Sequence, residues 1–138
     1  MTSDEARRRF AESRVAHLAT ADAGGVPHLV PITFAVAGDS ILSAVDAKPK
    51  RDVALRRIAN ITVNPRVSVL VDRYGEAWDR LWWARADGTA RIVDGGAEFE
   101  ASVARLRERY PQYEAVGIIG PLIVIQVARW SSWTASTG

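Results

Sequence analysis

The chain contains no cysteine. This absence excludes disulfide bonds, thiolate metal sites and a cysteine nucleophile, and it fits a reducing compartment. With 138 residues the chain has the usual size of one domain, which buries enough surface to fold without covalent cross-links. We therefore predict a single domain over residues 1–138 and no metal site.

Long apolar runs are also missing. Residues 1–9 are polar and charged, and no apolar stretch of about 7–15 residues follows, as a secretory signal would need. The most apolar segment, residues 118–127, is shorter than the ~20 residues that a membrane-spanning helix needs. These features predict a soluble, cytoplasmic protein that does not insert into a membrane.

An excess of one charge and the common catalytic motifs are absent too. The net charge is +2, and the 16 acidic residues are scattered among the basic ones, which argues against nucleic-acid binding. There is no G-x-S-x-G, H-E-x-x-H, Walker loop or G-x-G-x-x-G. His17 and His28 fall inside predicted strands, where we expect packed or edge positions. If the protein is an enzyme, a bound cofactor must carry the reaction.

What the sequence does contain is a series of short strands. Alternating or apolar segments predict strands over residues 15–20, 27–36, 40–46, 66–71, 89–93 and 122–130, with tight turns at 22–25 and 87–88. Helical patterns are confined to residues 3–13, with Phe10 as anchor, to 52–59, with Asp52 as N-cap, and to 97–109. The long helices between strands that a βαβ fold needs are missing. We therefore predict a mainly β (α+β) fold, a barrel with small peripheral helices.

Proline interrupts the best alternating strand. His28, Val30 and Ile32 share one predicted face of residues 27–36, while Pro31 lies in the middle of the segment. Because proline cannot donate to a strand ladder, Pro31 predicts an edge, a bulge or a place where the sheet opens.

A basic segment precedes the second predicted helix. Lys48, Lys50 and Arg51 lie within four positions, just before a helix N-terminus whose free N–H groups favour an anion. Phosphate is the natural ligand of such a segment. The alternative is a solvated loop whose charges pair with Asp46 and Asp52.

An aromatic stretch follows the fourth predicted strand. Tyr74, Trp78, Trp82 and Trp83 are interleaved with charged residues. Tryptophan favours interfaces and ligand sites, so this stretch suits a planar ring that carries a phosphorylated tail. Equally, these rings can plug the barrel ends or form a small satellite core.

Several segments together resemble a known family. They are residues 14–20 (RVAHLAT), 25–34 (GVPHLVPITF), 45–51 (VDAKPKR), 55–60 (LRRIAN), 64–72 (NPRVSVLVD), 81–88 (LWWARADG) and 130–133 (WSSW). The P-H-L-V-P and K-P-K parts are the most specific. In these segments the chain resembles the split β-barrel flavin and deazaflavin proteins related to pyridoxamine-phosphate oxidase. Within that family it looks most like the actinobacterial oxidoreductases that use coenzyme F-420.

The resemblance implies a six-stranded-type split barrel that forms a homodimer, with two cofactor sites at the subunit interface. The cofactor would be the deazaflavin coenzyme F-420, and hydride would pass from its ring to a conjugated or aromatic small-molecule acceptor. His28 and Tyr74 are the candidates for giving a proton to that acceptor. The implied cofactor-binding residues are Pro31, Ile32 and Thr33 at the ring, Lys48, Lys50, Arg51 and Asn60 at the phosphate and tail, Val71, Asp72, Arg73 and Tyr74 along the wall, and Trp78, Trp82 or Trp83 from the partner chain.

Two alternatives remain open at this point. FMN can occupy the same fold, although its shorter, singly phosphorylated tail needs fewer cations than residues 48–51 supply. A protein that stores cofactor or heme without turnover is the third hypothesis.

Overall fold

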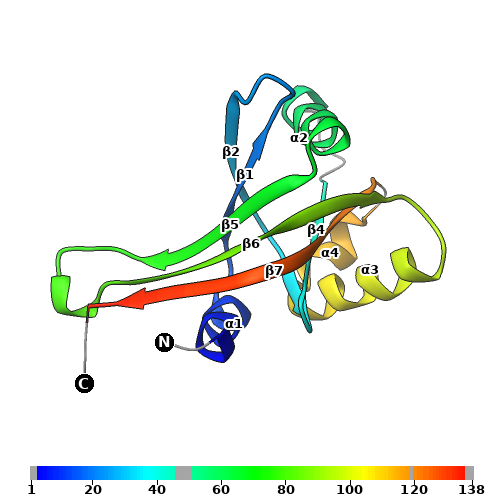
Figure 1. Ribbon diagram of the computed structural model, residues 1–138. Coiled ribbons are helices and arrows are strands. Elements are labelled where there is room, and N and C mark those ends of the chain that lie inside the picture. Colours follow the sequence, from blue (N-terminus) through cyan, green and yellow to red (C-terminus); the bar gives the residue numbers. More distant parts are fainter. Residues whose placement is uncertain (1–2, 46–50, 119, 136–138) are drawn as a thin grey trace.

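The computed structural model describes residues 3–45, 51–118 and 120–135, without the side chains of residues 51–55, 115 and 116. Strands and helices alternate irregularly along the chain (Figure 1). The strands are β1 (Ala16–Ala21), β2 (Pro27–Ile32), β3 (Ala35–Ala37), β4 (Ser40–Ala44), β5 (Arg66–Arg73), β6 (Trp82–Val93) and β7 (Leu122–Thr134). The helices are α1 (Ser3–Glu12), α2 (Arg51–Val63), the short 3-10 helix η1 (Trp78–Arg80), α3 (Ala97–Arg109) and α4 (Gln112–Val116).

The described strands form one antiparallel sheet in the order β2-β1-β5-β6-β7-β4-β3. The two edge strands, β2 and β3, are consecutive in sequence and are joined only by Thr33 and Phe34. Because two residues span at most about 7 Å, the sheet must curl until its edges meet at this point. The mainly antiparallel sheet with a few helices matches the predicted split barrel, although the described sheet has seven strands where six were predicted. Pro31 lies on the edge strand β2, as predicted.

Residues Thr33 and Phe34 break the strand that the alternation predicts to run over 27–36, so that prediction is wrong. The Tyr110 hydroxyl takes the place of a neighbouring strand here: it accepts a hydrogen bond from the Phe34 N–H at 3.1 Å and lies 2.9 Å from the Phe34 carbonyl oxygen. The Ser43 hydroxyl donates to the Thr33 carbonyl at 2.8 Å. Side chains that are distant in sequence thus form the hydrogen bonds that the backbone needs at the point where the chain passes from one edge strand of the sheet to the other.

Strand β6 is continuous where the sequence predicts a turn at residues 87–88, so the predicted hairpin is wrong. The chain passes through Asp87 and Gly88 with a register shift against β7 instead of turning. A Cβ atom on Gly88 would lie 2.1 Å from the Gln126 carbonyl oxygen. The glycine is therefore required by the close approach of β7 at an irregularity in the ladder.

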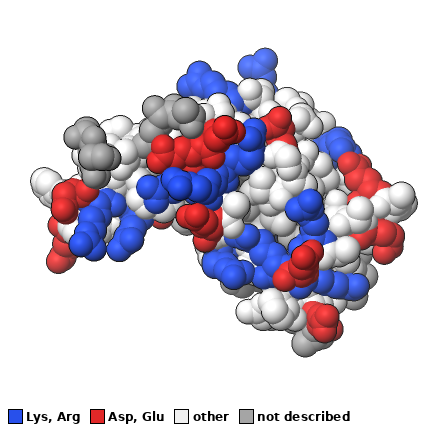
Figure 2. Space-filling model, turned by 90° about the horizontal axis from the view of Figure 1, so that it is seen from below, with Lys and Arg blue, Asp and Glu red and all other residues white. Residues whose placement is uncertain are grey.

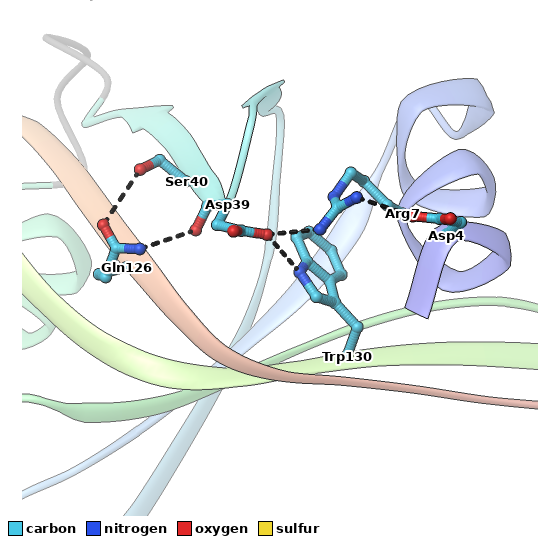
Figure 3. A network of polar contacts seen from close by, with 6 residues as sticks. All are labelled: Asp4, Arg7, Asp39, Ser40, Gln126 and Trp130. Carbon is cyan, nitrogen blue, oxygen red and sulfur yellow. Dashed lines mark hydrogen bonds and ion pairs between the residues drawn. The ribbon is translucent and has the colours of Figure 1, made fainter. Parts of the chain in front are cut away.

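Helix α1 covers the barrel through Phe10, which is fully buried as predicted and packs edge-on against Phe34 and Trp130. Polar contacts fix the helix in place (Figure 3). Asp39, in the turn between β3 and β4, accepts hydrogen bonds from the Arg7 guanidinium at 2.5 Å and from the Trp130 indole N–H at 3.1 Å. Helix α3 matches its prediction. Helix α2 extends to Val63, beyond the predicted end, and Asp52 lies inside the helix and not at its N-cap.

Strands β5, β6 and β7 extend beyond the barrel as an arm, at the left of Figure 1, and η1 lies at its tip. Helices α1 and α3 both lie below these strands in the same view. Basic and acidic side chains lie next to one another over the face shown in Figure 2. No helix within the described part of the chain is long and apolar enough to cross a membrane.

Candidate functional site

The register of the strands sorts their side chains onto two faces. Burial along β1 shows that Ala16, Leu18 and Thr20 face the core, so His17 and Ala19 lie on the outer face. His17 is paired with Pro31 of β2 on one side and with Leu70 of β5 on the other. Leu70 in turn faces Arg85 of β6. These four residues form a row across the outer face, and the candidate site lies along that row.

One end of the row opens into a pocket of about 270 Å³, which we call the β2 pocket. It brings together the three residues that the resemblance assigns to the ring of the cofactor. Apolar side chains and one cation form its walls, which suits a planar ring that carries an anionic group. Its lining residues are Val15, Pro31, Ile32, Thr33, Ala44 and Arg57.

Elements distant in sequence position this pocket. The Thr33 hydroxyl lies 2.6 Å from the Tyr113 hydroxyl of α4, which fixes the side chain at the strand break. Ala44 ends β4, and α2 supplies Arg57. The basic segment lies between these two elements in sequence. Lys48 and Lys50 themselves lie outside the described residues, as does the side chain of Arg51.

Asn60 is not among the lining residues of the β2 pocket. It is a buried residue of α2, and its side-chain amide donates to the Thr20 hydroxyl of β1 at 3.0 Å. This contact ties α2 to β1. Its predicted contact with the phosphate stays a prediction, and the structure gives Asn60 a role in holding α2 in place.

The other end of the row opens into a second hollow of about 330 Å³, which we call the aromatic pocket. The Arg85 guanidinium carbon lies 5.5 Å from the centre of the Trp83 ring, and Tyr74 packs against Trp133 at 6.4 Å between ring centres. The pocket therefore offers aromatic surface with a cation and a carboxylate at its rim. Its lining residues are Leu70, Asp72, Tyr74, Trp83 and Arg85.

His17 separates the two pockets. Adjacent strands lie about 4.8 Å apart, so Pro31 and Leu70 are about 10 Å from each other with the exposed His17 between them. The prediction of a packed or edge position is wrong for His17, because β1 has a strand on each side and the imidazole faces outward. The strict alternation of residues 16–20 was the signal that could have placed it. Arg57 and Arg85 were also missed, since nothing local distinguishes them from other surface arginines.

The remaining predicted wall residues fall on different surfaces. Val71 is buried in the core, so its side chain cannot reach a ligand on the outer face. Arg73 is exposed at the end of β5, and Trp78 is 77% exposed at the tip of the arm. Trp82 packs against the core beneath the guanidinium of Arg9, which lies 4.4 Å from its ring centre. Trp82 is therefore a packed ring, although it packs against the main core and not in a separate satellite core.

His28 shares a face of β2 with Val30 and Ile32, opposite to the face of Pro31. Burial lowers the pKa of its imidazole, and the charges of Arg56 and Arg57 lower it further. Its Nδ1 atom is buried and has no hydrogen-bond partner among the described residues. A lowered pKa keeps the ring neutral near pH 7, which disfavours the predicted role as a proton donor. Among the described residues we find no cluster of acidic and histidine side chains that could hold a metal.

Comparison with known proteins relates nearly the whole chain to one family. A family model described as pyridoxamine 5′-phosphate oxidase matches residues 2–134. A conserved hypothetical protein from Mycobacterium tuberculosis is 28% identical and has a TM-score of 0.73, with 98% of this chain and 86% of that chain covered. No curated protein matches the chain.

Two further solved structures share the fold at lower identity. A FAD-binding protein from Mesorhizobium loti is 20% identical with a TM-score of 0.73, covering 96% of this chain and 94% of its own. The heme storage protein from Vibrio cholerae is 17% identical with a TM-score of 0.73, covering 95% of this chain and 92% of its own.

Proposed function

The chain belongs to the pyridoxamine 5′-phosphate oxidase family, and from this premise we propose that it is a cofactor-dependent oxidoreductase. The proposed cofactor is the deazaflavin coenzyme F-420, bound in the β2 pocket. The proposed substrate is a conjugated or aromatic small molecule that accepts hydride. The observation that carries the proposal is the convergence of Pro31, Ile32 and Thr33 with the cation Arg57 on one pocket.

The chemistry of this pocket fits the proposed group. Val15, Pro31 and Ile32 give it apolar walls against which a planar ring can pack, and Thr33 adds one oriented hydroxyl. The long tail of a deazaflavin is anionic. Arg57 on the wall supplies one cation for such a tail, and Lys48, Lys50 and Arg51, which precede it in sequence, are the further cations that we propose for it. FMN, with its shorter tail, needs fewer of them.

We also propose that the site is completed by a second copy of the chain. The β2 pocket, at about 270 Å³, is smaller than the ~300 Å³ at which ligand sites typically begin, and the aromatic pocket, at about 330 Å³, is only slightly larger. The outer face exposes apolar side chains that are costly to leave in water: Leu29 is 66% exposed and Trp133 is 39% exposed. A third hollow of about 590 Å³ lies on the same face, over Ala19 and Ser68. Pairing of two such faces would enclose these hollows.

The chemistry that a deazaflavin supplies when bound is hydride transfer between its C5 position and an acceptor stacked against the ring. The protein's own residues would hold the ring on Pro31 and Ile32, fix the tail with cations, and exclude water once a second subunit covers the row. His17 and Tyr74 face the same side as both pockets, whereas His28 does not. His17 and Tyr74 are therefore better placed than His28 to give a proton to an acceptor.

Titration of the cofactor-free protein with coenzyme F-420, FMN and hemin tests the proposal. Binding is followed by quenching of tryptophan fluorescence, and hemin also by its Soret band. We expect saturable binding of F-420 at one molecule per subunit and much weaker binding of FMN. Tight FMN binding would support the proposed pocket but identify FMN, and not F-420, as its cofactor. Tight hemin binding with no F-420 binding would refute the oxidoreductase proposal and favour cofactor storage.

Variants locate the bound tail. Lys50→Ala and Arg57→Ala should each weaken F-420 binding by about 1–3 kcal/mol, the usual loss for a hydrogen bond to a charged group. Arg56→Ala is the matched control, because Arg56 is exposed on the same helix and does not line the β2 pocket. Equal affinity of the wild type, Lys50→Ala and Arg57→Ala proteins would refute the assignment of the tail to this segment.

A further inference from the structure

A second charged pocket lies away from the proposed cofactor site. It has a volume of about 350 Å³ and sits between the C-terminal end of α1, β3 and the last turns of α3. We call it the arginine pocket, because Arg14, Arg105 and Arg109 line it together with a single carboxylate, that of Glu108. It shares no lining residue with the β2 pocket, which opens on the other side of the Thr33–Phe34 strand break.

Backbone carbonyl groups hold the three guanidinium groups in position. Arg109 donates to the carbonyl oxygen of Ala11 at 2.7 Å and to that of Ser13, at the end of α1. Arg14 donates to the carbonyl oxygen of Arg109 at 2.9 Å, at the end of α3. Arg105 donates to the Val36 carbonyl oxygen of β3 at 3.3 Å. Each arginine is therefore oriented before any ligand arrives.

These contacts explain the positions of the arginines but leave most of the N–H donors of Arg14 and Arg105 available for a ligand. A guanidinium carries five N–H donors. The contacts above use one donor of Arg14 and one of Arg105, and Arg109 is the arginine whose main role is to cap α1. The groups that accept these bonds are neutral carbonyls, and a helix C-terminus contributes only about half a negative charge.

The charge of the pocket is also unbalanced. Within the described part of the chain, none of the three arginines forms an ion pair with a carboxylate, and Glu108 does not approach them closely enough to do so. Three positive charges thus meet one negative charge around a space large enough for a small molecule. Oriented guanidinium groups are the donors that match the paired oxygens of a phosphate or carboxylate group.

We propose that the arginine pocket binds a small oxyanion, a molecule that presents a phosphate or carboxylate group to Arg14 and Arg105. Arg109 is a positioning residue, because it joins the ends of α1 and α3 and thereby fixes the pocket between them. A ligand held there would bridge α1, β3 and α3, so it would stabilise the folded chain in proportion to its occupancy.

The test uses the cofactor-free full chain and two probes, inorganic phosphate and citrate, with sodium chloride at equal ionic strength as the reference. Thermal melting midpoints and calorimetric titrations are measured in the wild type and in the Lys50→Ala protein, so that binding at the predicted cofactor phosphate site is distinguished from binding at the arginine pocket. We expect saturable stabilisation by phosphate, citrate or both, and the stronger probe identifies the preferred group. Arg105→Gln and Arg14→Gln should each raise the Kd about tenfold or more.

Arg107→Gln is the matched control, since Arg107 is exposed on the same helix and does not line the pocket. It should bind the probes as the parent protein does. Stabilisation that chloride reproduces at equal ionic strength would overturn the proposal. So would equal affinity in the Arg105→Gln and Arg107→Gln proteins, or binding that Lys50→Ala abolishes. These results are independent of F-420 binding, so the two proposals can fail separately.

Discussion

Replacing Tyr110 by phenylalanine removes one oxygen atom from the point where the chain changes from one edge of the sheet to the other. Tyr110 is only 8% exposed. Its hydroxyl accepts a hydrogen bond from the Phe34 N–H at 3.1 Å and lies 2.9 Å from the carbonyl oxygens of Phe34 and Arg14. The ring itself would remain, with its edge-on contact to Tyr113. The substitution therefore isolates the hydrogen bonds of the hydroxyl from the packing of the ring.

The expected cost follows from the groups that lose their partner. The Phe34 N–H and one carbonyl group would remain buried without a hydrogen bond, and each such group costs about 1–3 kcal/mol. We expect the free energy of unfolding to fall by roughly 2–4 kcal/mol. For a domain of this length that corresponds to a melting temperature lower by about 6–12 °C.

Urea denaturation followed by tryptophan fluorescence measures this loss. The midpoint should fall while the slope of the unfolding free energy against urea stays the same, because the surface exposed on unfolding hardly changes. Tyr74→Phe is the control, since Tyr74 is 61% exposed and its hydroxyl has no hydrogen bond to a described residue. A loss below about 0.5 kcal/mol for Tyr110→Phe, equal to the control, would show that the hydroxyl does not maintain the strand break.

Two further stability predictions concern Asp39 and Gly88. Hydrogen bonds from Trp130 and then Arg7 lower the pKa of Asp39 below its unfolded value, so its contribution to stability is complete above that value and is lost as the pH falls through the folded pKa. Melting temperatures measured below about pH 5 should therefore fall more steeply for the wild type than for Asp39→Asn, and parallel curves would contradict this. Gly88→Ala should destabilise the chain by at least about 2 kcal/mol in the same urea assay, because the new Cβ would meet the Gln126 carbonyl oxygen at 2.1 Å. Unchanged stability would mean that β7 can move away at little cost.

Local patterns predicted the elements whose cause is local. The helix at 97–109 follows from the spacing of Val103 and Leu106, which the structure buries together. The turn at 22–25 follows from Asp22, whose carboxylate accepts the N–H groups of Gly24 and Val26, and from Gly25 with its positive φ. In both cases the residues that determine the element lie within it.

The wrong predictions concern elements whose cause is distant. Residues 27–36 alternate perfectly, yet the strand breaks because Tyr110 and Ser43 bond to its backbone. Asp87 and Gly88 have the composition of a hairpin turn, yet Gly88 lies in a long strand because Gln126 passes close by. Neither partner can be read from the segment itself. Only the assembled sheet shows which neighbour each backbone group meets.

The residues of the candidate site also differ in whether local or distant sequence determines their position. Pro31, Ile32 and Thr33 are adjacent in sequence, so a resemblance placed them together, and the structure puts all three on one pocket. Arg57 joins that pocket from another element. His17 gains its central position only through the pairing of β1 with both β2 and β5. A prediction from single segments cannot contain such a row of residues, because the row runs across the strands.

Composition alone does not show whether a tryptophan packs in the core or faces a ligand or interface. The strand register shows on which side each ring lies. Side chains alternate faces along a strand, so neighbours such as Trp82 and Trp83 must point in opposite directions. Trp82 packs on the core under Arg9, while Trp83 faces outward opposite Trp133 of β7. Trp130, three positions before Trp133, lies on the inner side against Phe10. The core interpretation is thus correct for Trp82 and Trp130, and the interface interpretation stays a prediction for Trp83 and Trp133. Trp83 and Trp133 are accordingly the pair whose fluorescence should respond to a ligand or a second subunit on the outer face, and the fluorescence of Trp82 and Trp130 should report unfolding.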